Sequence, residues 1–161
     1  MWNSSGWKRR KRTIPSSGFQ QKLSEWNEIQ GPLADLYRSY IACLNSEDWE
    51  NLGTYVDENV GYNGQTVGLV GYRQAREDEF REIPDLHFDI SILVPNENTV
   101  ASRLDFNISP RGELLGLPVN GKRVSFSENV FYEYENGKIA GVWSIVDRAA
   151  VEAQIAKSSE A

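Results

Sequence analysis

Residues 124–147 read VSFSENVFYEYENGKIAGVWSIVD, and this stretch decides the fold. In its first half, apolar and polar residues alternate with the period of a β-strand. The pair Asn136-Gly137 then separates two alternating segments, and this pair favours the tight turn that joins antiparallel strands. The sequence therefore predicts a β-hairpin with one apolar face that ends at Asp147.

Upstream of this hairpin, residues 86–108 repeat the two-residue period on both sides of a turn at residues 95–98. Before Pro84 the apolar spacing changes to three and four residues, which predicts three helices, at about 33–44, 49–56 and 71–83. Residues 57–64 read as a loop, and 149–156 as a short terminal helix. Helices followed by an antiparallel meander predict one α+β domain with its helices on one face of the sheet.

The first 31 residues form a basic extension with six Lys or Arg against two Glu, whereas the rest of the chain carries 11 basic and 21 acidic residues. The run at residues 8–12 is either a nuclear localisation signal, a docking arm or a solvated extension. A short helix near residues 19–29 would end at Gly31-Pro32. We therefore predict a domain at residues 32–156, preceded by this extension and followed by a tail at 157–161.

Composition restricts the classes of function. With 40% hydrophobic residues in 161, the chain can bury a core, and no apolar run approaches the roughly 20 residues that span a bilayer. We expect a cytoplasmic protein, or a nuclear one if residues 8–12 act as a signal. The acidic body disfavours nucleic acid as a partner, and one Cys and one His exclude disulfides and a multi-Cys/His zinc site.

Two carboxylates interrupt apolar rows of the predicted hairpin. Glu128 falls on the face of Phe126 and Val130, and Asp147 continues the row that includes Trp143. A buried carboxylate is costly unless it is paired or protonated, and a raised pKa suits it to acid/base catalysis. The alternatives are that Asp147 caps the terminal helix, and that Glu128 forms an ion pair with Arg103 or Arg76.

Several aromatic residues could line a pocket for a flat ligand, although residues at these periods usually belong to the core. They are Tyr40, Tyr55, Tyr62, Trp49 and Trp143. His87 lies on the polar face of its strand and reads as a surface or dimer-interface residue, and Cys43 reads as a small core residue.

The chain resembles the SnoaL-like polyketide cyclase family over about residues 32–155. The motifs that carry this resemblance are GELLGLPVNGK at residues 112–122, NGKI at 136–139, IPDL at 83–86, Trp143 and Asp147. The resemblance implies the nuclear-transport-factor-2-like fold, in which helices wrap a curved antiparallel sheet into a cone. It also implies a homodimer formed through the outer face of the sheet, no metal or organic cofactor, and Asp147 as the acid/base.

Other positions depart from the polyketide cyclases. Val130 stands where those enzymes have a His, and Glu128 where they have a Gln. Pro110 replaces another His of the family. The counterpart of a polar residue near the start of the sheet is Tyr62 or Asn63. The expected site therefore combines catalytic Asp147 and Glu128 with a substrate-binding surface made of Tyr40, Tyr55, Tyr62, Asn63, Phe126, Val130 and Trp143.

The leading functional hypothesis is a cofactor-independent cyclase or isomerase that acts on a small hydrophobic polycyclic ketone or ester of secondary metabolism. The alternatives are a non-catalytic binding module of the same fold, and an epoxide hydrolase that uses Arg103 and Asp105. Because one fold hosts many functions, the geometry of the site has to distinguish them.

Overall fold

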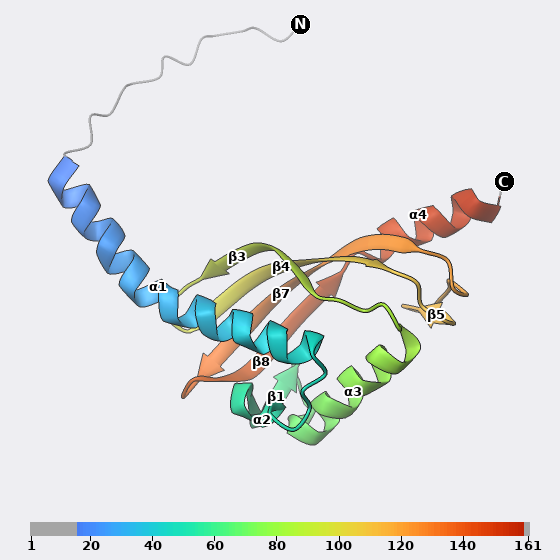
Figure 1. Cartoon of the computed structure of the whole chain (residues 1–161), viewed down its shortest axis with the longest axis horizontal. Coiled ribbons are helices and arrows are strands. Elements are labelled where there is room, and N and C mark those ends of the chain that lie inside the picture. Colours follow the sequence, from blue (N-terminus) through green and yellow to red (C-terminus); the bar gives the residue numbers. More distant parts are fainter. Residues whose placement is uncertain (1–15, 160–161) are drawn as a thin grey trace, which may run out of the picture.

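The computed structural model describes residues 16–159, so the basic run at residues 8–12 lies outside the described residues. Within them, a six-stranded curved sheet has the order β2-β1-β8-β7-β4-β3. Its strands are β1 (Val56–Tyr62), β2 (Gln65–Thr66), β3 (Asp89–Pro95), β4 (Thr99–Ile108), β7 (Val124–Glu135) and β8 (Lys138–Val146). A separate small hairpin consists of β5 (Glu113–Leu114) and β6 (Leu117–Pro118). The expected α+β fold with a curved antiparallel meander is confirmed (Figure 1).

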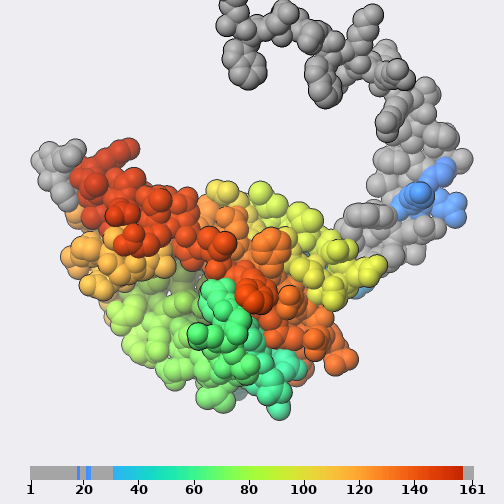
Figure 2. Space-filling model, turned by 180° about the vertical axis from the view of Figure 1, so that it is seen from behind, coloured from blue at the N-terminus to red at the C-terminus, as the bar shows by residue number. Residues whose placement is uncertain are grey.

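Four helices accompany the sheet in the described part of the chain: α1 (Ser16–Asn45), α2 (Leu52–Tyr55), α3 (Gly68–Glu82) and α4 (Arg148–Ser159). The helix α1 crosses the sheet, α3 packs beside β1, and α4 lies against the segment that carries β6 (Figures 1 and 2). None of these helices, within residues 16–159, combines the length and apolarity that a bilayer crossing requires.

The core lies between the helices and the inner face of the sheet. The α1 residues Tyr37, Tyr40 and Leu44, spaced by three and four positions, are each at most 1% exposed. They pack against Leu104 and Val130 of the sheet, which are equally buried. Burying each such side chain contributes about 1.5–3 kcal/mol.

Two predictions about individual elements are wrong. Gly31-Pro32 does not end a helix, because α1 continues through Pro32 to Asn45. Residues 57–64 are mostly strand rather than loop, since β1 runs parallel to β8 along its edge. Only Val56 and Val60 are buried in that strand, and the polar residues between them conceal the strand period.

Two β-bulges interrupt the alternation on which the predicted faces depended. In β8, Gly141 pairs with Glu133 and Ile139 pairs with Tyr134, so Ala140 is an extra residue. Because a one-residue shift moves every later side chain to the other face, Val142 is buried whereas Ile145 is 75% exposed. An equivalent irregularity between Ile90 and Ile92 in β3 leaves Ile92 on the outer face.

Candidate active site

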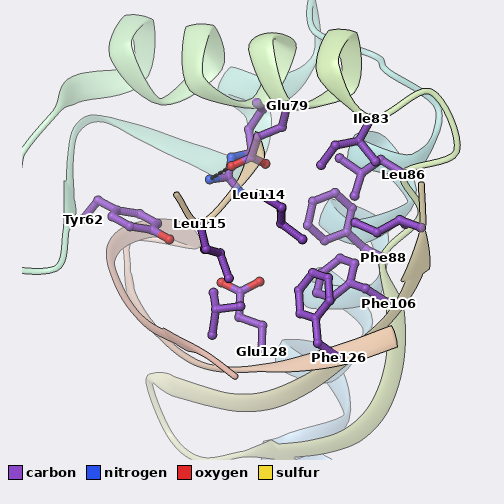
Figure 3. A pocket seen from close by; sticks show the side chains of 13 residues that line it. Tyr62, Glu79, Ile83, Leu86, Phe88, Phe106, Leu114, Leu115, Phe126 and Glu128 are labelled. Atoms are coloured by element: carbon purple, nitrogen blue, oxygen red, sulfur yellow. Dashed lines mark ion pairs between the residues drawn. The ribbon is translucent and has the colours of Figure 1, made fainter. Parts of the chain in front are cut away.

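A cavity of about 180 Å³ lies between α3 and the inner face of the sheet (Figure 3). The small hairpin β5–β6 contributes Leu114 and Leu115 to its wall. Most of the other lining side chains are apolar, and three of them form an aromatic series in which Phe106 stacks on Phe126 at 5.1 Å and meets Phe88 edge-on at 5.5 Å. The polar lining residues are Tyr62, Arg76, Glu79 and Glu128.

Glu128 is the carboxylate that the sheet contributes to this cavity. It is only 8% exposed, and in Figure 3 its carboxylate points into the cavity from β7. The Ser144 hydroxyl of β8 donates a hydrogen bond to Glu128 Oε1. The prediction that Glu128 lies on the apolar face of β7 is confirmed, because the pairing of β4 with β7 continues without a bulge from Thr99 to Ile108.

An arginine and a second carboxylate enter the cavity from α3. Arg76 Nη2 lies 2.9 Å from Glu79 Oε1, and the Arg76 side chain is 11% exposed. The guanidinium also lies over the rings of Tyr72 at 5.4 Å and Tyr62 at 5.9 Å, within the range of cation–π attraction. Arg76 Nε is buried and has no hydrogen-bond acceptor among the described residues. An unmet buried donor costs about 1–3 kcal/mol.

Charges in the cavity influence one another. Burial raises the pKa of Glu79 above its usual range, the Arg76 charge opposes this rise, and the Glu128 charge adds to it. Burial disfavours the charged form of Arg76, but Glu79 and the neighbouring tyrosines outweigh it and raise the pKa of Arg76. Arg76 is therefore permanently cationic beside a carboxylate that holds its proton more readily than an exposed one.

Among the charged lining residues, the sequence interpretation missed Glu79 and considered Arg76 only as a possible ion-pair partner of Glu128. Arg76 and Glu79 lie at spacings of four, three and four residues between Tyr72 and Ile83, which are both buried. This spacing places all four residues on one helix face. Two charged residues on an apolar helix stripe were the signal that could have identified them.

Of the predicted substrate-binding residues, Tyr62 and Phe126 line the cavity. Tyr40 and Val130 lie in the core, where Tyr40 Oη is 2.5 Å from Tyr72 Oη. Tyr55 packs against Tyr40 at 6.5 Å between ring centroids.

The remaining two predicted residues lie elsewhere. The Asn63 side chain accepts a hydrogen bond from the Ser144 amide at 2.8 Å and is exposed. Trp143 lies on the outer face, 46% exposed, because it follows the bulge at Ala140.

Asp147 follows Val146, which lines the cavity, but Asp147 itself does not line it. Its side chain is exposed, and its Oδ1 accepts a hydrogen bond from the Ala150 amide at 3.0 Å in the first turn of α4. This is the geometry of a helix N-cap. The capping alternative is thus directly observed, and a catalytic role of Asp147 stays a prediction.

Arg103 and Asp105, on which the epoxide hydrolase alternative depended, lie on the outer face of the sheet. Arg103 Nε is 3.3 Å from Asp105 Oδ1, and its Nη2 donates to Ser127 Oγ at 2.8 Å. Both charged side chains are nearly half exposed and neither lines the cavity.

The sequence model of the family of SnoaL-like polyketide cyclases matches residues 34–155. This range includes every residue that lines the cavity. The chain belongs to the SnoaL-like polyketide cyclase family. A SnoaL-like polyketide cyclase from Agrobacterium tumefaciens str. C58 is 46% identical, with a TM-score of 0.75, over 76% of this chain and 97% of that chain. Among proteins of curated function, none matches this sequence significantly.

More distant solved structures share the fold. AclR from Streptomyces galilaeus, a proposed hydroxylase, is 18% identical with a TM-score of 0.66, over 80% of this chain and 98% of that one. IdmH from Streptomyces antibioticus, a proposed polyketide cyclase, is 18% identical with a TM-score of 0.67, over 77% of this chain and 98% of that one. Membership of this family and a cavity with buried charges indicate a protein of the cyclase and isomerase type that binds a small molecule.

Proposed function

We propose that this SnoaL-like protein catalyses an intramolecular cyclisation or isomerisation of a ketone or ester by proton transfer, with Glu128 as the acid/base. The observation that carries the proposal is a carboxylate, 8% exposed, that points into an apolar cavity (Figure 3). A general base has to lie within hydrogen-bond reach of the proton that it removes, and a side chain that points into the cavity can meet this condition for a bound substrate.

The proton balance of the proposed reaction needs no oxidant or reductant. Glu128 takes a proton from the carbon next to the substrate carbonyl, and the electrons of that C–H bond form the double bond of an enolate. In an isomerisation, the same group returns the proton at another carbon. In a cyclisation, the enolate carbon attacks a second carbonyl of the same molecule, and the resulting alkoxide takes the proton.

Hydrogen exchange tests this assignment without knowledge of the natural substrate. Phenylacetone in D₂O would be incubated with protein, and deuterium incorporation next to the carbonyl followed by NMR. We expect wild-type protein to accelerate the exchange and Glu128→Gln to lower the rate about 10²- to 10⁴-fold.

Asp147→Asn is the matched carboxylate control, and we expect it to stay within a few-fold of wild type. A loss of exchange in Asp147→Asn with exchange retained in Glu128→Gln would overturn the assignment in favour of Asp147. Binding of phenylacetone by wild type without any accelerated exchange would instead favour a non-catalytic binding module.

We also propose that the chain forms a homodimer through the outer face of the sheet. Large apolar side chains there are 46–75% exposed, and they come from β3, β7 and β8: Ile92, Val94, Phe131, Trp143 and Ile145. Phe131 pairs directly with Trp143, so the apolar surface continues from one strand to the next. An exposed patch of this kind marks an interaction surface.

Sedimentation velocity tests the dimer. Wild type should sediment as twice the chain mass, and Ile145→Lys should sediment as a monomer, because a charge at this position has to be desolvated in the interface. The matched control is Val70→Lys, which replaces an exposed apolar residue of α3 at 84% exposure. A wild-type monomer, or an Ile145→Lys dimer of unchanged stability, would contradict the proposal.

A further inference from the structure

One polar group in the cavity has no role in the proton transfer proposed for Glu128. Arg76 lines the cavity, and its Nε–H is buried with no acceptor among the described residues. Buried donors in folded proteins nearly always have a partner, so an unmet donor beside a cavity suggests that a ligand supplies the acceptor.

The guanidinium is held so that this donor stays in place. Glu79 Oε1 accepts from Nη2 at 2.9 Å, and the Tyr72 and Tyr62 rings lie 5.4 and 5.9 Å from the guanidinium carbon. These contacts engage other parts of the planar group, so the Nε–H is a buried donor left without a partner among the described residues. A positioned cationic donor of this type stabilises negative charge as it develops on a substrate oxygen.

The size of the cavity limits what can lie beside Arg76. Its volume is about 180 Å³, whereas a dry cavity of about 150 Å³ binds benzene, and pockets for drug-sized ligands measure about 300–1,000 Å³. The aromatic series of Phe88, Phe106 and Phe126 supplies an apolar surface for one ring. The enclosed part of a ligand is therefore about one ring, and a polycyclic molecule would extend beyond the cavity.

We propose that Arg76 is a further catalytic residue whose Nε–H binds the carbonyl oxygen of an enolisable substrate, with about one ring of that substrate enclosed in the cavity, and stabilises the enolate. This inference rests on the proposed function, because the enolate is the product of proton removal by Glu128. The Arg76 charge stabilises the oxygen while Glu128 holds the proton, so the two groups act on opposite ends of the same O=C–C–H unit.

The probe for this role is 4-nitrophenol, a one-ring phenol whose anion mimics an enolate and absorbs differently from the neutral form. Spectroscopic titration gives the affinity of each form. We expect wild type to bind the phenolate at least tenfold more tightly than the phenol, and Arg76→Gln to lose this preference. Arg103→Gln, the same change on the outer face, should keep the preference unchanged. Preferential binding of the neutral phenol, or equal behaviour of the two variants, would overturn the proposal.

A second measurement keeps the proposal testable if Arg76→Gln does not fold. In ¹⁵N-labelled wild type, the Arg76 Nε–H resonance, assigned with Arg76→Lys, should move downfield as phenolate is added. An unchanged resonance at saturation would overturn the role.

The failure of this inference is distinguishable from the failure of the proposed function. Phenolate binding involves no proton removal from carbon, so Glu128→Gln should retain it even though hydrogen exchange is lost. A second outcome is hydrogen exchange that depends on Glu128 while phenolate binding is unchanged in Arg76→Gln. This outcome would leave the proposed function intact and reject only the catalytic role of Arg76.

Discussion

The two faces of the sheet carry nearly the same set of polar groups in opposite surroundings. On the inner side, Arg76 pairs with Glu79 and a serine bonds to Glu128. On the outer face, Arg103 pairs with Asp105 and Ser127 bonds to both. The Arg76 side chain is 11% exposed and that of Arg103 is 45% exposed. The comparison therefore sets a buried arginine–carboxylate pair beside a half-exposed one.

The pKa values of the two acids shift in opposite directions. Hydrogen bonding by Ser127, aided by the neighbouring Arg103, lowers the pKa of Asp105. Burial raises the pKa of Glu79 although Arg76 lies beside it. An arginine next to a carboxylate is thus no sign of an active site by itself, and only the inner set combines it with an enclosed apolar cavity.

The largest expected difference between the faces is in stability. Arg76→Gln leaves the Glu79 carboxylate without its partner in the cavity wall, and breaking a buried pair costs about 3–5 kcal/mol. Because Glu79 is 39% exposed and can take up a proton, we expect a loss of about 2–3 kcal/mol. Arg103→Gln removes a surface pair and should cost less than about 1 kcal/mol. Urea unfolding measures both.

Equal losses for the two arginine variants would contradict the assignment of the inner set as buried and the outer set as solvated. A larger loss for Arg103→Gln would show that the outer trio is covered, as it would be inside a dimer interface. Repeating the unfolding with the monomeric Ile145→Lys variant separates this explanation from an intrinsic contribution of the outer pair.

The accuracy of the sequence prediction also differs between strands, for a physical reason. Glu128 could be placed on the inner face because β7 pairs with β4 in unbroken register. The face of Asp147 could not be predicted in the same way. The extra residue Ala140 moves Trp143 and Ile145 outward and brings Ser144 and Val146 inward. A bulge depends on the neighbouring strand, so the alternation within β8 alone does not reveal it.

The missed parts of the site have a related cause. Opposite charges three residues apart, such as Arg76 and Glu79, are also common on exposed helices, so their spacing alone does not distinguish a cavity wall from a solvated face. Their burial depends on how α3 lies over the sheet, which only the tertiary structure shows (Figure 3). The fold followed from local periods, whereas the cavity required contacts between α3, β7 and the β5–β6 hairpin.

The smallest expected difference is in the pH dependence of stability, where the two acids should act with opposite sign. The pKa of Glu79 is raised on folding, so its contribution is fully present below the usual Glu pKa of about 4.3 and is lost as pH rises through the raised value. The pKa of Asp105 is lowered, so its contribution is present above about 3.9 and is lost as pH falls.

Melting temperatures between about pH 3 and pH 7 test this difference with Glu79→Gln and Asp105→Asn, each compared with wild type at the same pH. As pH rises, Glu79→Gln should become more stable relative to wild type, and Asp105→Asn less stable. The unpaired Arg76 in Glu79→Gln lowers stability at every pH, so the slope carries the information rather than the absolute value. Slopes of the same sign would mean that the two acids do not shift in opposite directions, and the contrast between the inner and outer pairs would fail.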